Sequence, residues 1–289
     1  MRIARTVLAA VIVAAGVFAA GPASSAPASS SAAALQIQYK KRVVVGAPGD
    51  VVSGTVLCPA GTRMVNSGAG NAGIASITPL PDFTGASATG QLRSAAARAF
   101  LEIVVGCLPQ SQVPGVSSAR WISRTETFFS DAQGSRRGVV SCPSGTRAFG
   151  GGGSFRTPQG APSTKGNAMY SNGVTADGTG WTMMGHSSSL SETLVITTQC
   201  APLPGAHVAQ AHVPLPNNPI AEKIVHAPCT PGDTMISGGV YLSRSDGTEQ
   251  QGGVLDSFPG AEGWIVSGIS HGFPDTKLVA LAQCFLPAG

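Results

Sequence analysis

The sequence predicts an all-β protein built from three homologous repeats. Charged residues are 11% of the 289 residues, and the chain contains 38 glycines and 21 prolines; ordinary globular domains have about 25% charged residues. Short runs of strand-forming residues alternate with turn signals about every 8 to 15 residues. After the N-terminal segment, no window of about a dozen residues keeps a convincing helical hydrophobic period. These features are typical of β-sandwich or β-prism packing.

The N-terminal segment has the pattern of a secretory signal peptide. Arg2 and Arg5 precede an apolar run at 8–20, and small residues follow it. The run is too short to span a bilayer about 30 Å thick. We therefore expect a signal peptide at 1–26, a flexible Ser/Ala/Pro tether at 27–35, and a secreted, extracellular mature chain that is not attached to a membrane.

The rest of the chain divides into repeats at 36–110, 117–204 and 205–287. Five β-rich segments recur in them. The first segments are 37–45, 119–129 and 206–215; the second, each ending in a cysteine, are 51–58, 135–142 and 222–229; the third, rich in glycine, are 63–70, 147–153 and 234–240. The fourth segments are 180–186 and 263–270, with Gln91 taken as the repeat 1 equivalent of their tryptophan, and the fifth are 100–107, 193–200 and 278–284. A loop of variable length is expected between the third and fourth segments.

The six cysteines follow the same repeat. Three of them head a turn (Cys58, Cys142 and Cys229), and three end a β-rich run (Cys107, Cys200 and Cys284). Six thiols allow 15 pairings, and an exported chain favours disulfides. The simplest pairing stays within repeats: Cys58 with Cys107, Cys142 with Cys200, and Cys229 with Cys284. No thiol then remains for catalysis.

The glycine runs raise the question of a phosphate-binding loop, most plainly in "CPSGTRAFGGGGSF" at 142–155. Such a loop needs a preceding strand, a following helix and a terminal Lys-Ser/Thr pair. That helix and that pair are missing from the pattern. The glycines are better explained as positions that permit a bulge or the close passage of a neighbouring sheet.

No catalytic or metal-binding constellation emerges, and no cofactor is expected. "GISHG" at 268–272 matches G-x-S-x-G with Ser270 as nucleophile, but that motif requires a strand-to-helix turn and a histidine later in the chain. The only later histidine is its neighbour His271. The remaining histidines lack zinc-site spacing: His186, His207, His212 and His226.

Two tryptophans are the best candidates for a binding site. Trp181 and Trp264 both follow a glycine at the start of the fourth segment. Each indole either caps the core of its repeat or forms a stacking platform for a sugar ring. In the second case, polar loops at 171–180 and 256–263 would supply hydrogen bonds. The candidate residues there are Asn172, Asp177 and Asp256.

The charge balance argues against nucleic acid as a partner. Without Arg2 and Arg5, 16 basic and 14 acidic side chains remain, a net charge of about +2. Only Lys40–Arg42 and Arg136–Arg137 cluster. Nucleic-acid binding needs a concentrated basic surface.

The Cys-Pro-x-Gly turn, the glycine pair after it and the terminal cysteine together resemble secreted actinobacterial triple-repeat β proteins. More distantly, they resemble the vitelline membrane outer layer proteins, whose three Greek-key sheets form a β-prism. The resemblance covers 36–287 and implies a non-catalytic extracellular protein that binds glycans or envelope material. Two architectures stay open, a single pseudo-threefold β-prism and three small sandwiches in tandem. The expected role is binding or structural, with polysaccharide or another secreted protein as partner; the alternatives are an exported hydrolase and an inhibitor or adaptor subunit.

Overall fold

The computed structural model describes residues 35–93, 99–112, 122–128, 135–163, 167–217, 221–244, 252–270 and 275–286. All of them belong to one unit of the chain, 32–288. The expected signal peptide lies outside the described residues, and so does the expected tether apart from Leu35. Leu35 packs against a buried apolar cluster together with Ile37.

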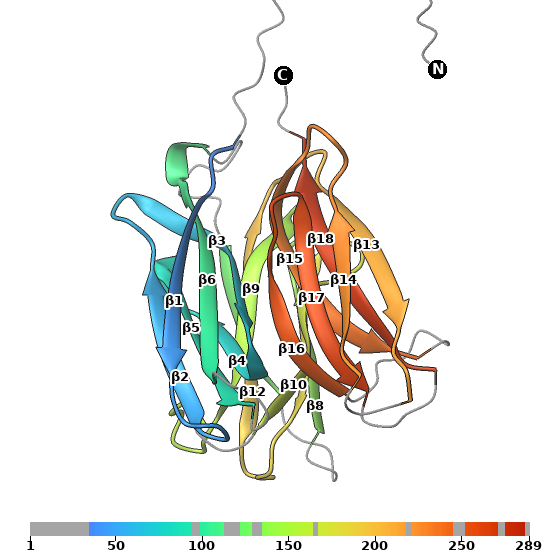
Figure 1. Ribbon diagram of the computed structural model, residues 1–289. Helices are drawn as coiled ribbons and strands as arrows, with labels where there is room; N and C mark the ends of the chain where they lie inside the picture. Colours follow the sequence, from blue (N-terminus) through green and yellow to red (C-terminus); the bar gives the residue numbers. More distant parts are fainter. Residues whose placement is uncertain are drawn as a thin grey trace, which may run out of the picture. The chain divides into compact units, whose positions relative to one another are not determined.

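The described residues form eighteen β-strands, and the predicted all-β class is confirmed (Figure 1). The strands fall into sets of six, one set in each predicted repeat. Repeat 1 contains β1 (Gln38–Val45), β2 (Val51–Leu57), β3 (Thr62–Gly70), β4 (Ala72–Pro79), β5 (Gly85–Leu92) and β6 (Phe100–Pro109). Repeat 2 contains β7 (Ile122–Phe128), β8 (Ser135–Ser141), β9 (Arg147–Arg156), β10 (Ala168–Val174), β11 (Gly180–His186) and β12 (Thr193–Ala201). Repeat 3 contains β13 (His207–Pro214), β14 (Lys223–Pro228), β15 (Thr234–Ser243), β16 (Gly252–Pro259), β17 (Gly263–Ser270) and β18 (Lys277–Phe285). Two short 3-10 turns, η1 (Pro81–Phe83) and η2 (Gln110–Gln112), complete the elements.

Each repeat thus has six strands where the sequence predicts five segments. The additional strands are β4, β10 and β16, which occupy the stretch expected to be a variable loop. Their sequences, AGIASITP, AMYSNGV and GGVLDSFP, are rich in small and polar residues. Such residues give little hydrophobic alternation, and alternation is the main strand signal in a sequence.

Every sheet combines strands from two repeats. The three sheets have the orders β1-β6-β3-β16-β17-β14, β2-β5-β4-β9-β12-β7 and β13-β18-β15-β10-β11-β8. Each repeat is therefore divided into two three-stranded halves, and each half joins a half from another repeat (Figure 1). No sheet of the described residues is contained within a single repeat.

The glycine-rich strands lie where two halves meet. The junctions are β3 with β16, β9 with β4 and β15 with β10. A Cβ atom at Gly68 would collide with the Ser257 carbonyl, one at Gly152 with the Ile77 carbonyl, and one at Gly239 with Gly173. Only a residue without a side chain lets the partner backbone approach this far. The approach is made by a paired strand of the same sheet, whereas the sequence predicted the passage of a neighbouring sheet.

The same three strands also carry the predicted bulges. The register shifts between Met64 and Asn66 in β3, after Ala148 in β9, and between Met235 and Ser237 in β15. The residues Val65, Phe149 and Ile236 at these shifts gather in a small buried cluster with residues that follow the last cysteine of each repeat. A second, larger cluster contains Trp181 and Trp264 and includes residues from all three repeats. The core is therefore shared between repeats.

Two buried amides add hydrogen bonds between repeats. Asn66 Nδ2 donates to the Ile236 carbonyl at 3.2 Å, joining repeats 1 and 3. Gln199 Nε2 donates to the Met64 carbonyl at 2.8 Å, joining repeats 2 and 1. Both side chains are buried. Because an unpaired buried amide is costly, these bonds favour the shared arrangement over separated repeats.

The three disulfides join the pairs that the repeat alignment predicts: Cys58–Cys107, Cys142–Cys200 and Cys229–Cys284. They close separations of 49, 58 and 55 residues, and no free cysteine remains. In each repeat the first cysteine follows a strand of one sheet and the second lies in a strand of another. The three bonds consequently connect the three sheets to one another in a closed circuit.

Candidate functional site

The two predicted tryptophans are core residues. Trp181 and Trp264 are each 2% exposed. Their Nε1 atoms donate to Asn172 Oδ1 at 2.8 Å and to Ser257 Oγ at 3.0 Å. A stacking platform needs an exposed ring face, so the burial supports the core interpretation and argues against a platform.

A glycine lies beneath each indole. A Cβ atom at Gly151 would meet the Trp181 ring, and one at Gly238 would meet the Trp264 ring. The sequence alignment placed Gln91 at the equivalent position of repeat 1, and this is wrong. The strand registers align Gly85, Gly180 and Gly263, so the equivalent residue is Ala86. The error arose because the glycine that precedes the indole was matched to Gly90 instead of Gly85.

Asn172, Asp177 and Asp256 do not converge on one site. Asn172 lies in β10 and accepts the Trp181 hydrogen bond. Asp256 lies in β16, where it accepts from the backbone N–H of Asn71 at 2.7 Å and from Ser267 Oγ. Two of the three predicted loop residues are therefore strand residues, and both are occupied by contacts within the protein.

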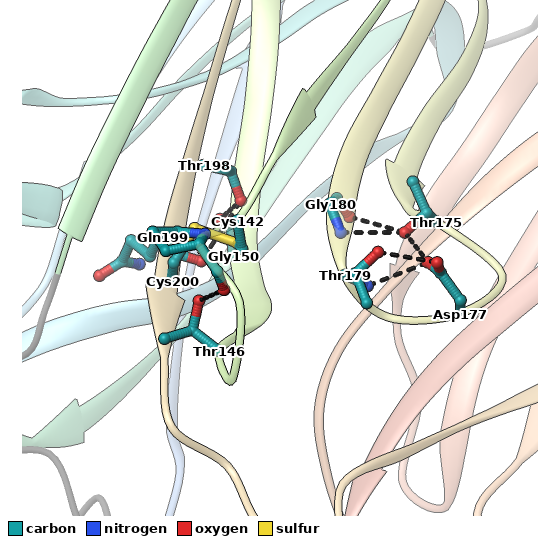
Figure 2. The surroundings of a disulfide bond; sticks show 11 residues. Cys142, Thr146, Gly150, Thr175, Asp177, Thr179, Gly180, Thr198, Gln199 and Cys200 are labelled. Atoms are coloured by element: carbon teal, nitrogen blue, oxygen red, sulfur yellow. Dashed lines mark hydrogen bonds between the residues drawn. A yellow bond between two sulfur atoms is a disulfide. The ribbon is translucent and has the colours of Figure 1, made fainter.

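Asp177 does lie in a loop, between β10 and β11 (Figure 2). Its carboxylate accepts from Thr175 Oγ1 at 2.6 Å, from the Thr179 backbone N–H at 3.0 Å and from Thr179 Oγ1 at 2.8 Å. These bonds, led by the Thr175 hydroxyl, hold the pKa of Asp177 below its ordinary value of 3.8. The carboxylate organises its own turn, which leaves it poorly placed to bind a ligand.

The residues weighed for hydrolysis and metal binding are also dispersed. Ser270 is fully buried at the end of β17, and its neighbour His271 lies outside the described residues. His186, His207 and His226 lie on β11, β13 and β14, and His207 Nε2 is 3.4 Å from Asp233 Oδ2. In the described part of the chain, no group of three or more His, Cys, Asp or Glu could hold a metal ion.

A surface that the sequence analysis missed is formed by three strands of repeat 1. The tripeptides SGT at 53–55, SIT at 76–78 and SAT at 87–89 lie in β2, β4 and β5. Side chains alternate between the two faces of a strand, so the serine and threonine of each tripeptide share a face. All six are exposed or half-buried, whereas the residue between them is buried in each tripeptide.

The strand register arranges these six hydroxyls in two rows. Thr89 pairs with Ser53 on one side and Ser76 on the other, while Ser87 pairs with Thr55 and Thr78. Ser53 and Thr89 share a hydrogen bond of 2.8 Å, as do Thr55 and Ser87. We call this array the hydroxyl face; it consists of Ser53, Thr55, Ser76, Thr78, Ser87 and Thr89.

A cleft of about 190 Å³ adjoins the hydroxyl face where repeat 1 meets repeat 2. Ser76, Thr78, Ser87 and Thr89 form one side of it. The other side comes from the end of β9 and the segment after it: Ser154, Phe155, Arg156, Pro162, Ser163 and Asn167. The hydroxyl face therefore continues into a concave site built by two repeats.

A buried carboxylate fixes the far wall of this cleft. Glu192 is 2% exposed and accepts from Ser163 Oγ at 2.7 Å, from Asn167 Nδ2 at 3.3 Å and from Ser187 Oγ at 2.6 Å. Two buried atoms of the lining, Ser154 Oγ and Asn167 Oδ1, have no hydrogen-bond partner. Buried polar atoms are normally satisfied, so these two are suited to a ligand or to bound water.

A second depression of about 270 Å³ includes Leu35, Tyr39, Asp233 and Glu262 in its lining. It is larger than the cleft. The cleft beside the hydroxyl face is the better candidate because unpartnered polar atoms converge in it.

Comparison with known proteins gives no family for this chain. No protein-family model matches the sequence, and no curated protein matches it. Within the described residues, no helix has the length and apolar character needed to cross a membrane.

Proposed function

We propose that this protein is exported and binds saccharides, without catalysing a reaction, through the hydroxyl face and the adjoining cleft. The observation that carries this proposal is the ordered array of six hydroxyls that leads into a polar cleft.

The array suits an extended, hydroxyl-rich ligand. Neighbouring strands lie about 4.8 Å apart, and residues two apart on one strand are separated by about 6.8 Å. The hydroxyl face thus repeats its hydrogen-bonding groups over distances similar to those between groups on a sugar chain. Each hydroxyl both donates and accepts, as sugar hydroxyls do. Several weak contacts made together give useful affinity to a repeating polymer.

Export is supported by two independent features. The N-terminal sequence follows the signal-peptide pattern, and all six cysteines form disulfides. Disulfides of this kind persist in oxidising compartments outside the cytosol. An envelope or extracellular polysaccharide is a ligand that such a protein would meet.

A non-catalytic role is favoured over the hydrolase alternative by the position of Ser270. A nucleophilic serine must reach its substrate, and Ser270 is fully buried within a strand. The polar side chains of the cleft are hydroxyls, one amide and one guanidinium, and the carboxylate of Glu192 behind its wall is occupied by three hydrogen bonds. That arrangement suits recognition.

The test is retention of the purified mature chain on isolated cell wall and on a panel of insoluble polysaccharides. The triple variant Thr78→Val, Ser87→Ala, Thr89→Val removes three hydroxyls while nearly preserving side-chain size. We expect it to lose most of the retention, at least tenfold in affinity, and to melt normally. Thr127→Val is the matched control, because Thr127 is an exposed hydroxyl on β7 at the other edge of the same sheet.

Two results would contradict the proposal. One is failure of the wild-type chain to bind any saccharide on the panel. The other is equal retention of the triple variant and the wild type, which would remove the hydroxyl face from any binding role.

A further inference from the structure

We propose that the cleft selects a sugar that carries a carboxylate, and that Arg156 holds this group. The inference rests on the proposed saccharide binding and specifies the class of saccharide. It depends on three observations: the charge of the lining, the hydrogen-bonding capacity left at Arg156, and the unpartnered atoms opposite it.

Arg156 is the only charged residue among the described residues that line the cleft. It is half-buried at the end of β9. Its Nη1 atom donates to the Gly160 carbonyl at 3.1 Å, which is neutral. A guanidinium carries five N–H donors, so most of its capacity is left for a ligand.

Two buried charged residues lie close to the wall of the cleft, Glu192 and Arg136. Glu192 lies behind the wall and is not part of the lining; its carboxylate already accepts three hydrogen bonds. A second guanidinium, that of Arg136, is buried with its Cζ atom 5.5 Å from the centroid of the Phe155 ring. Arg156 therefore remains the one charged side chain in the described lining, which favours an anion beside it.

The wall of the cleft near Arg156 presents hydrogen-bond acceptors, so it favours hydrogen-bond donors on a ligand. Ser163 gives its hydroxyl proton to Glu192, so this proton is not offered to a ligand. Asn167 Oδ1 is an acceptor without a partner, and Ser154 Oγ is also unpartnered. A ligand that satisfies the cleft must therefore bring hydroxyl donors to the wall and an anionic acceptor to Arg156.

A sugar acid combines these groups on one ring. A carboxylate can take two parallel N–H bonds from a guanidinium, and such charge-assisted pairs are about twice as strong as neutral hydrogen bonds. Ring hydroxyls next to the carboxylate supply the donors for Asn167 and Ser154. A neutral sugar would satisfy the wall and leave Arg156 without its best partner.

The experiment compares two probes with the same sugar chain that differ at the carboxyl group: an oligogalacturonate, which is anionic, and its fully methyl-esterified form, which is neutral. Calorimetric titration of the wild-type mature chain should show about tenfold to hundredfold tighter binding of the free acid, the range expected for a charge-assisted hydrogen bond. The preference should decrease as salt is raised.

Arg156→Gln should abolish the preference and keep the affinity for the ester. Arg156→Lys should retain part of it, since an ammonium ion attracts the carboxylate but cannot bind it with a planar fork. Lys223→Gln, which removes an exposed positive charge from β14, is the matched control and should change nothing. Thermal melts establish that each variant is folded.

The outcomes separate this inference from the proposed function. Equal binding of acid and ester by the wild type, or a preference that survives in Arg156→Gln, overturns the acidic-sugar inference and leaves saccharide binding in place. Failure of the wild type to bind either probe also overturns the inference. Saccharide binding itself then stands or falls with retention on cell wall and on the neutral polysaccharides of the panel.

Discussion

The half of repeat 1 formed by β2, β4 and β5 and the corresponding half of repeat 3, formed by β14, β16 and β17, have the same strand order and different side chains. In repeat 3, β17 places Trp264 in the core, where its indole bonds to Ser257 and covers Gly238. In repeat 1, β5 places Ala86 at that position. The indole and the alanine both face inward, so the core tolerates a large change in size at equivalent positions.

The outer faces of these two strands differ as well. The equivalents of Ser87 and Gln91 in β5 are Ile265 and Ile269 in β17, and β14 beside it exposes Ile224. At the positions of the six hydroxyls of repeat 1, repeat 3 has three apolar residues, Ile224, Phe258 and Ile265, and three polar ones, His226, Asp256 and Ser267, so the hydroxyl array is not repeated there. Both faces therefore vary between the two repeats, but the inner positions stay apolar and buried, whereas the outer positions change between polar and apolar residues.

The largest effect is expected when repeat 3 is separated from its neighbours. We expect residues 205–287, expressed alone with the disulfide intact, to lack a cooperative thermal transition. Its strands are divided between two sheets, and in each sheet they pair with strands of another repeat. Calorimetry and proton NMR dispersion provide the measurement. A sharp transition in the isolated repeat would show that each repeat folds independently and that its differences from repeat 1 are purely local.

The second largest effect on stability is expected at Trp264, which repeat 1 replaces by Ala86. Trp264→Ala should lower the free energy of unfolding by about 3 to 5 kcal/mol, because it removes a large buried side chain and leaves a cavity. Ala86→Gly, at the equivalent position, should cost only about 1 kcal/mol. Urea denaturation of both variants checks the difference. Similar, small losses would mean that Trp264 contributes little to the core.

The smallest effect on stability is expected at the turn that joins β10 to β11 in repeat 2 and β16 to β17 in repeat 3. In repeat 2 this turn is organised by Asp177, whereas in repeat 3 the Gly260 N–H donates to the Gly263 carbonyl at 2.7 Å. Since the pKa of Asp177 is lowered in the folded protein, its ionised form stabilises the fold above about pH 4. That contribution is lost as the pH falls through the lowered pKa.

Asp177→Asn should therefore lower the melting temperature by only about 1 °C at pH 7, because the carboxylate is largely exposed and screened by water. The difference from wild type should shrink below pH 4. A deficit that stays constant from pH 7 to pH 2 would contradict an effect of the carboxylate charge. Scanning calorimetry across this pH range gives the answer.

Local and periodic features made much of the fold predictable. The turn that follows Cys58 and the β-rich run that ends at Cys107 recur in all three repeats, so the repeat alone suggested the disulfide pairs. The glycines could be interpreted from their positions in strands, since a missing side chain has few structural explanations. The hydroxyl face also has a signal in the sequence, the three Ser-x-Thr tripeptides. The serine and threonine of a tripeptide share a face only if the tripeptide lies in a strand, and the sequence analysis did not predict β4 as a strand.

What the sequence by itself determined is the strand-forming character of the chain, its threefold repetition and the cysteine pairs suggested by that repetition. Only the tertiary structure decided which repeats share a sheet, that Trp181 and Trp264 are buried, and that Ser76 and Arg156 line one cleft. The physical reason is that alternation along a strand defines two faces without saying which is covered. Which face is covered depends on partner strands that are distant in the chain. Backbone N–H and C=O groups can pair with those of any strand that comes close enough, so the pairing leaves little trace in the sequence.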